Sequence, residues 1–245
     1  MSLSPLDTVN GVFSLIFVVI SLLVGVIILT RYFKYKERIY FLVGMTWILI
    51  SEPWWSSSLS FLVAISNGVG IPEQIYFLIG NALVPLAIIL WLLAFTEFLY
   101  TEKRKLILII FAIIGASFEI LFFIFLFLEP SLIGELNGPV DVNYYSFIMV
   151  YLIIFILIVV ITGFLFAQLS LKSKDPEVKL KGILLIIAYI TFLFGAILDS
   201  AIPSWSDLHP VTIIIARLIL IVSAICWYGG FLLPKWMKKF IMRKK

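Results

Sequence analysis

GVFSLIFVVISLLVGVIILTR, residues 11–31, is an apolar run in which only the last residue, Arg31, is charged. At 1.5 Å per residue, a helix of this length crosses about 30 Å of hydrocarbon. Similar runs recur along the whole chain, separated by short polar segments, and the predicted spans are 11–31, 39–60, 73–99, 105–128, 143–170, 182–203 and 210–233. The sequence therefore predicts an all-α, polytopic membrane protein with one seven-transmembrane domain over residues 1–245.

The composition supports this prediction and argues against several kinds of function. Of the 245 residues, 63% are hydrophobic and 13% are charged, a balance too apolar for a soluble domain of this size. The single cysteine, Cys226, and the single histidine, His209, offer neither a disulfide nor a cluster of metal or haem ligands, so we expect no metal and no cofactor. Segment 211–234 has no lysine, which excludes an opsin with a retinal Schiff base. Intramembrane protease motifs and glycine-rich phosphate loops are missing, so we expect no enzyme.

The basic residues predict the orientation in the membrane. Of the 18 Lys and Arg residues, all but Arg217 fall in the four segments 31–38, 102–105, 172–181 and 234–245. With seven spans these segments lie on one side, which the positive-inside rule assigns to the cytoplasm. The N-terminus is then outside and the C-terminus inside. The net charge of +4 follows from this topology and requires no nucleic-acid partner, although the basic tail can also contact anionic lipid headgroups.

Four ionisable residues lie inside the predicted spans. Counted from the basic residue at the inner end of each span, Glu52 and Glu119 both lie about 21 Å deep, and Asp199 and Arg217 both lie about 27 Å deep. Charges at such depths normally face the bundle interior and find partners. Asp199 and Arg217 are the expected ion pair. Two interpretations remain open for this pair: it binds a ligand, or it only clamps the last two helices together.

The stretch ISEPWW, residues 50–55, is the most unusual part of span two. Pro53 interrupts the helical hydrogen bonds beside Glu52, a combination typical of a helix that lines a cavity. Trp54, Trp55 and the serines 56–58 would then form an aromatic and hydroxyl wall on its outer side. The alternative interpretation is an interfacial aromatic belt beside a kinked helix end.

The order of these features resembles the seven-transmembrane sensor region at the N-terminus of many archaeal and bacterial histidine kinases. The similarity lies in FLVGMTWILISE (41–52), IYFLIGNALVPLAIILWLLAFTEFLY (75–100), LKGILLIIAYITFLFGAIL (180–198), DLHPVTIIIARLIL (207–220) and GFLLPKWMKKF (230–240). In those kinases the last helix continues into phosphotransfer and ATP-binding parts, whereas this sequence stops at Lys245. The resemblance therefore implies a stand-alone sensor in the cell membrane. It would take a small-molecule ligand at its outer side and signal through a separate cytoplasmic protein at its basic loops and tail.

Two other functions remain as alternatives. In a small-solute or proton-coupled transporter, Glu52, Glu119 and Asp199 would form the relay. An internal similarity between NALVPLAIILW (81–91) and RLILIVSAICW (217–227), which places Asn81 and Arg217 ten residues before a tryptophan, would fit the repeated halves of such a transporter. In a membrane scaffold or complex subunit, the polar residues would bind a partner helix instead.

Overall fold

The computed structural model describes residues 3–201 and 209–242 and is 85% helical. Seven helical segments are long and apolar enough to cross a membrane, which confirms the predicted all-α, multi-pass architecture. Their bounds are Pro5–Tyr35, Arg38–Asn67, Glu73–Phe98, Thr101–Leu128, Ser146–Leu171, Pro176–Ser200 and Pro210–Leu232.

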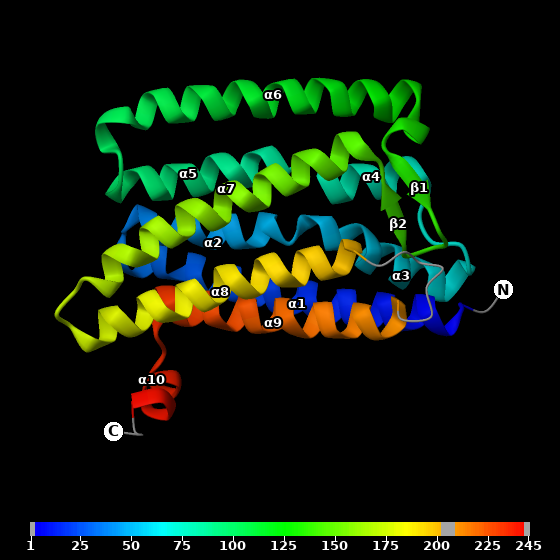
Figure 1. Ribbon diagram of the computed structural model, residues 1–245. Coiled ribbons are helices and arrows are strands. Elements are labelled where there is room, and N and C mark those ends of the chain that lie inside the picture. The colour runs from blue at the N-terminus through cyan, green and yellow to red at the C-terminus, as the bar shows by residue number, and fades with distance from the viewer. Residues whose placement is uncertain (1–2, 202–208, 243–245) are drawn as a thin grey trace.

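Some spans are subdivided, and short elements join or follow them (Figure 1). The α-helices are α1 (Pro5–Tyr35), α2 (Arg38–Ile50), α3 (Trp55–Asn67), α4 (Glu73–Asn81), α5 (Val84–Phe98), α6 (Arg104–Leu128), α7 (Ser146–Leu171), α8 (Pro176–Ala201), α9 (His209–Leu232) and α10 (Lys235–Met242). The remaining elements are the 3-10 helices η1 (Glu52–Trp54), η2 (Thr101–Lys103) and η3 (Pro130–Leu132) and the antiparallel strands β1 (Gly134–Leu136) and β2 (Val142–Tyr144).

Some helices differ from the predicted spans at their ends. The first helix begins at Pro5, because Ser4 and Asp7 form a capping box that continues the helix beyond the apolar run. The fifth helix begins at Ser146, not at 143, because residues 142–144 pair with 134–136 in a short hairpin outside the spans. The predicted end of span six, residues 202–203, lies outside the described residues.

Spans two and three are both broken helices. The break in span two is η1, and it confirms the effect expected from Pro53. Span three breaks between Asn81 and Val84, one residue before Pro85, which the sequence analysis did not predict. The segments α4 and η1 are in contact, so the two breaks lie next to each other in the bundle.

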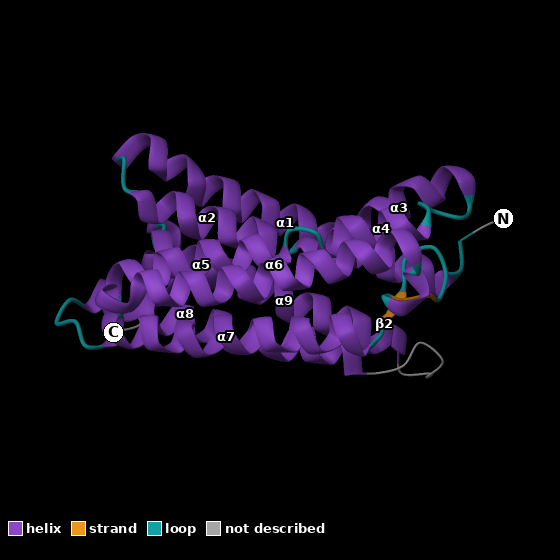
Figure 2. Cartoon of the chain, turned by 90° about the horizontal axis from the view of Figure 1, so that it is seen from above, coloured by secondary structure: helices purple, strands orange, loops and turns teal. Residues whose placement is uncertain are grey.

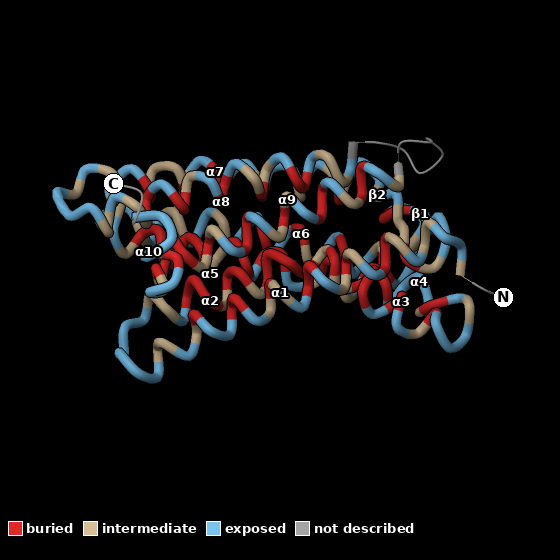
Figure 3. Tube along the Cα trace, turned by 90° about the horizontal axis from the view of Figure 1, so that it is seen from below, coloured by how far each residue is buried: buried red, intermediate tan, exposed pale blue. Residues whose placement is uncertain are grey.

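The helices form a bundle with one peripheral member. The adjacent pairs include α8 with α9, α1 with α2, and α1 with α9, and Figure 1 shows α6 alone along one edge. The crossing of α1 and α2 is very close, because a Cβ added at Gly44 would lie 2.9 Å from the carbonyl oxygen of Gly25. Figure 3 shows the buried residues concentrated between the helices. The span that contains α6 is only 17% buried inside the protein, as expected for a helix that faces lipid.

The two ends of the bundle differ in charge. The loop after α1, the loop between α5 and α6, the loop between α7 and α8, and α10 lie at one end, opposite the N-terminus (Figures 1 and 2). We call this basic end the inner end and the opposite end the outer end. All four predicted basic segments therefore meet on one side of the bundle.

We expect reporter fusions or cysteine labelling to place the N-terminus outside the cell and the 31–38, 102–105 and 172–181 loops inside, because the basic residues resist translocation. The measurement is modification by a membrane-impermeant reagent in intact cells. An externally accessible tag after Lys174 would contradict this orientation.

Candidate functional site

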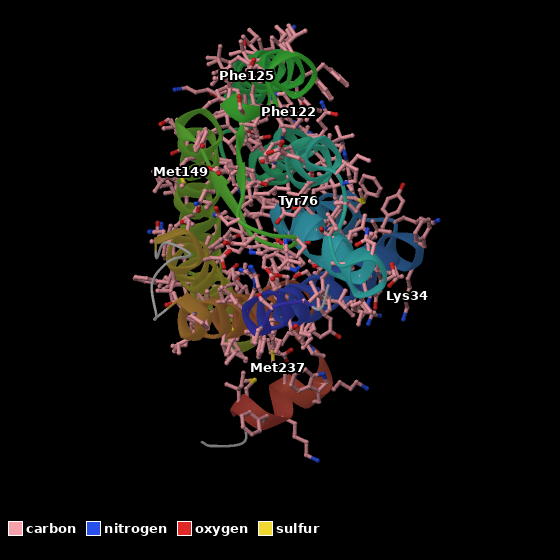
Figure 4. The ribbon with its side chains drawn as sticks, turned by 90° about the vertical axis from the view of Figure 1, so that its right-hand side faces the viewer. Lys34, Tyr76, Phe122, Phe125, Met149 and Met237 are labelled. Atoms are coloured by element: carbon pink, nitrogen blue, oxygen red, sulfur yellow. The ribbon has the colours of Figure 1, made fainter. Side chains whose placement is uncertain are left out.

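A cavity of about 430 Å³ lies in the outer half of the bundle. Its walls come from α1, from the broken span two, from β2 and from helices α7, α8 and α9. The polar and aromatic lining includes Asn10, Trp54, Ser57, Asp141, Tyr144, Asp199 and Arg217. Figure 4 views the bundle from this outer end and shows Tyr76 near the centre and Met149, a cavity residue of α7, to one side. A cavity of this size accommodates a small organic molecule.

Arg217 is the central polar residue of the cavity wall. It is only 3% exposed, and its guanidinium forms the predicted ion pair with Asp199. Its other nitrogens donate to Ser14 Oγ at 3.2 Å and to Asn10 Oδ1 at 3.3 Å. The guanidinium carbon also lies 5.7 Å from the ring centre of Trp54, within the range of a cation–π interaction. One side chain of α9 therefore connects α1, η1 and α8 around the cavity.

Asp199 completes this network from α8. One of its oxygens pairs with Arg217, and the other accepts a hydrogen bond of 2.9 Å from Trp54 Nε1. Trp54 packs edge-on against Phe17 of α1, with ring centres 5.0 Å apart, which fixes the indole. The network is well connected, so a ligand in the cavity would meet a preorganised set of polar groups.

The β1–β2 hairpin covers the outer end of the cavity. Its turn is held to three helices: Asn10 of α1 donates to the carbonyl of Val140 at 3.4 Å, Tyr76 of α4 donates to the same carbonyl at 3.1 Å, and Ser60 of α3 donates to Pro139. Val140 itself is fully buried. The hairpin thus forms a fixed cap, and its second strand contributes Tyr144 to the cavity wall.

Aromatic side chains fill the bundle below the cavity. Trp47, Trp91, Tyr189 and Trp227 are all buried, and the ring centres of Trp47 and Trp227 are 4.8 Å apart. This aromatic cluster contacts the cavity wall through Phe192, whose ring centre lies 6.0 Å from that of Trp47. None of the four cluster residues lines the cavity. Packed aromatic rings therefore lie between the cavity and the inner end.

The predicted site residues separate into two groups. The cavity brings together Trp54, Asp199 and Arg217, whereas Glu52, Asn81 and Glu119 are not among its lining residues. That an enclosed pocket reaches Glu52 stays a prediction, because this cavity is not lined by Glu52 and the side chain turns toward the break in span three. There Glu52 Oε1 accepts a hydrogen bond of 2.7 Å from the backbone N–H of Leu83.

Trp55 belongs to neither group. Its indole N–H donates to Ser51 Oγ at 3.0 Å, one helical turn back, and the residue does not line the cavity. The predicted aromatic wall therefore consists of Trp54 alone, because adjacent residues on a helix point in different directions.

The sequence analysis missed Asn10 and Tyr144, which line the cavity, and Ser14, which lies behind the wall as a partner of Arg217. Asn10 and Ser14 lie on α1 and bond to each other at 3.2 Å, and both are buried against Arg217. Their spacing of four residues places them on one helical face, a signal that the sequence did contain. Tyr144 was missed because its position depends on the hairpin.

No protein-family model matches the chain, and no curated protein matches it. The resemblance to the kinase sensor region therefore stays a prediction. Within residues 3–201 and 209–242, no three His, Cys, Asp or Glu side chains are grouped as metal ligands would be. The chemistry that the cavity offers is hydrogen bonding, charge and aromatic contact.

Proposed function

We propose that this protein is a receptor-like sensor in the cell membrane that binds a small amphipathic molecule in its outer cavity. The observation that carries this proposal is the cavity wall itself, where the buried guanidinium of Arg217 links three other elements. A ligand that competes for any of these hydrogen bonds changes how α1, α8 and α9 hold together. Differential binding of this kind is what shifts a population between two helix packings.

Helix α8 offers a route from the cavity to the inner end. Asp199 lies at its outer end, and Glu177, in its first turn, forms an ion pair with Lys238 of α10. Helix α9 makes a parallel connection, because Met237 of α10 packs against Gly229. A shift of α8 relative to α9 would therefore move α10.

Helix α10 would provide the signalling surface. It presents Trp236 and Phe240 to the exterior, at 60% and 76% exposure, on a helix that also carries three lysines. A separate cytoplasmic signalling protein is the partner that we propose for this helix and the neighbouring basic loops, together with the bilayer surface. We propose no nucleic-acid partner and no catalytic activity.

A transporter for small solutes or protons is the second candidate. The adjacent breaks in spans two and three favour it, because paired discontinuous helices often form the binding sites of transporters. The aromatic cluster below the cavity favours the sensor, because its buried rings pack between the cavity and the inner end. A third candidate, a scaffold or complex subunit, has no such observation in its support.

The cavity proposal predicts the behaviour of a filling substitution. Ala196, 9% exposed, lines the cavity, whereas Ala116 of α6 is on the exposed surface. We expect some members of a panel of amino acids, short carboxylates and small amines to raise the Tm of the purified full chain. That increase should be lost in Ala196→Phe, which occupies the cavity, and kept in the matched control Ala116→Phe.

Ligand stabilisation that survives in Ala196→Phe would place the binding site elsewhere. Uptake of the stabilising compounds into proteoliposomes distinguishes the two main candidates. The sensor proposal expects no uptake above that of empty vesicles, and uptake that Ala196→Phe abolishes would favour the transporter.

A further inference from the structure

The junction of the two helix breaks contains a polar site outside the cavity. Span two breaks at Glu52 because Pro53 has no N–H, and span three breaks before Pro85 for the same reason. In an unbroken helix the N–H of Leu83 would bond to a carbonyl four residues earlier. It bonds instead to Glu52 Oε1 at 2.7 Å, so one carboxyl oxygen joins the two broken spans.

Two buried acceptors remain at this junction. Glu52 is 1% exposed and Asn81 is fully buried, and within the described part of the chain neither Glu52 Oε2 nor Asn81 Oδ1 has a hydrogen-bond partner. The amide nitrogen of Asn81 is already used, because it donates to the carbonyl of Phe77 at 3.0 Å and to the hydroxyl of Tyr144 at 3.1 Å. A buried acceptor without a hydrogen bond lowers the stability of the folded protein, so each of these two oxygens is expected to have a donor.

The charges around Glu52 offer it no counter-ion. The ionisable groups within electrostatic range are Glu119 of α6 and Tyr144 of β2. Burial raises the pKa of Tyr144 to about 12, so its hydroxyl stays neutral at physiological pH. Tyr76 of α4 is occupied by Ser57 and by the carbonyl of Val140. No salt bridge to Glu52 is found among the described residues.

An ionised Glu52 would therefore be a buried, uncompensated charge next to a second acid. Such a charge is strongly unfavourable in a protein interior or membrane. A proton on Glu52 removes the charge and also turns Oε2 into a donor. Asn81 lies two residues before Leu83, whose N–H bonds to Glu52. The side-chain oxygen of Asn81 that lacks a partner is therefore at the same helix break as Glu52. One proton shared between Glu52 and Asn81 would satisfy both acceptors that lack a partner.

We propose that Glu52 holds a proton that it shares with Asn81 at the junction of the two broken helices, and that Tyr144 connects this proton site to the outer cavity. Tyr144 lines the cavity and accepts a hydrogen bond from Asn81. The proposed connection through Tyr144 depends on the function proposed for the cavity. The proposed proton site is independent of that function, because Glu52 and Asn81 do not line the cavity.

Infrared spectroscopy of the purified full chain at neutral pH tests the proton site without any ligand. We expect a carbonyl band of a protonated carboxylic acid that moves on deuterium exchange and on labelling of glutamate with ¹³C. The band should be lost in Glu52→Gln, which keeps the acceptor for Leu83. It should be unchanged in the control Glu97→Gln, whose carboxylate is near Arg38 and Arg104.

A second variant keeps the test decisive if Glu52→Gln fails to fold. Asn81→Ala removes the proposed acceptor of the acid proton, so it should shift the glutamate band without removing it. Tyr144→Phe should shift the same band by a smaller amount, because it only releases the Asn81 amide nitrogen.

Three results would overturn the proposal: no protonated glutamate band at neutral pH, a glutamate band that is the same in Glu52→Gln as in the wild type, or a band that vanishes in sodium buffer but not in potassium buffer. The last result would make the junction a sodium site. An unchanged band in Tyr144→Phe would remove only the connection to the cavity.

Discussion

Asp199→Asn should lower the free energy of unfolding by about 3 to 5 kcal/mol, the usual cost of breaking a buried ion pair from one side. Arg217 would keep its burial and its bonds to Asn10 and Ser14 but lose its counter-charge. The amide oxygen of the new asparagine can still accept the hydrogen bond from Trp54, so the loss of stability mainly measures the contribution of the charge. Denaturant or thermal unfolding of the protein in nanodiscs measures the effect.

The double variant Asp199→Asn, Arg217→Gln should be more stable than Asp199→Asn alone, because no unmatched cation remains in the wall. Glu97→Gln is the surface control: this acid lies 3.7 and 3.8 Å from Arg38 and Arg104 at the inner end. Glu97 is 21% exposed and its pairs are long and partly solvated, and such pairs contribute about 0 to 1 kcal/mol, so the control should change little. Simple additivity of the two single changes at Asp199 and Arg217 would mean that the two side chains act separately.

Glu52→Leu should destabilise the protein by about 1 to 3 kcal/mol, because the N–H of Leu83 would lose its acceptor at the break in span three, where no helical carbonyl replaces it. Glu52→Gln is the matched control, since its amide oxygen can still accept that bond. Thermal unfolding of both variants should therefore give a lower Tm for the leucine variant than for the glutamine variant. A leucine variant that is more stable than wild type would show that the carboxylate is only a tolerated polar residue beside a kink.

Most of the fold could be predicted from the sequence, because the membrane strongly restricts the structures that a spanning segment can adopt. Each lipid-crossing segment needs about 20 apolar residues and must satisfy its own backbone, so hydropathy locates the helices. The ends are less predictable, since caps such as Ser4 with Asp7 extend a helix beyond the apolar run. The break before Pro85 was missed because a proline at the start of a helix and a proline inside a helix look alike in an apolar sequence.

The depth of each ionisable residue in the membrane could be predicted, but the neighbours that its side chain contacts could not. A constant rise per residue places Asp199 and Arg217 at the same level, and the structure pairs them. The same count places Glu52 level with Glu119, but it does not say which neighbours each side chain faces. That depends on helix rotation and on non-local contacts, such as the hairpin that brings Tyr144 beside Asn81.

The contact between the broken spans has a consequence for biogenesis. A helix interrupted in the hydrocarbon region exposes backbone polar groups that lipid cannot satisfy. Span two carries the acceptor and span three carries the donor of the bond between Glu52 and Leu83. Each span is therefore less stable alone in lipid than when it is paired with the other. The short outer loop between α3 and α4 keeps them together as they leave the translocon, so the two are best inserted as one hairpin.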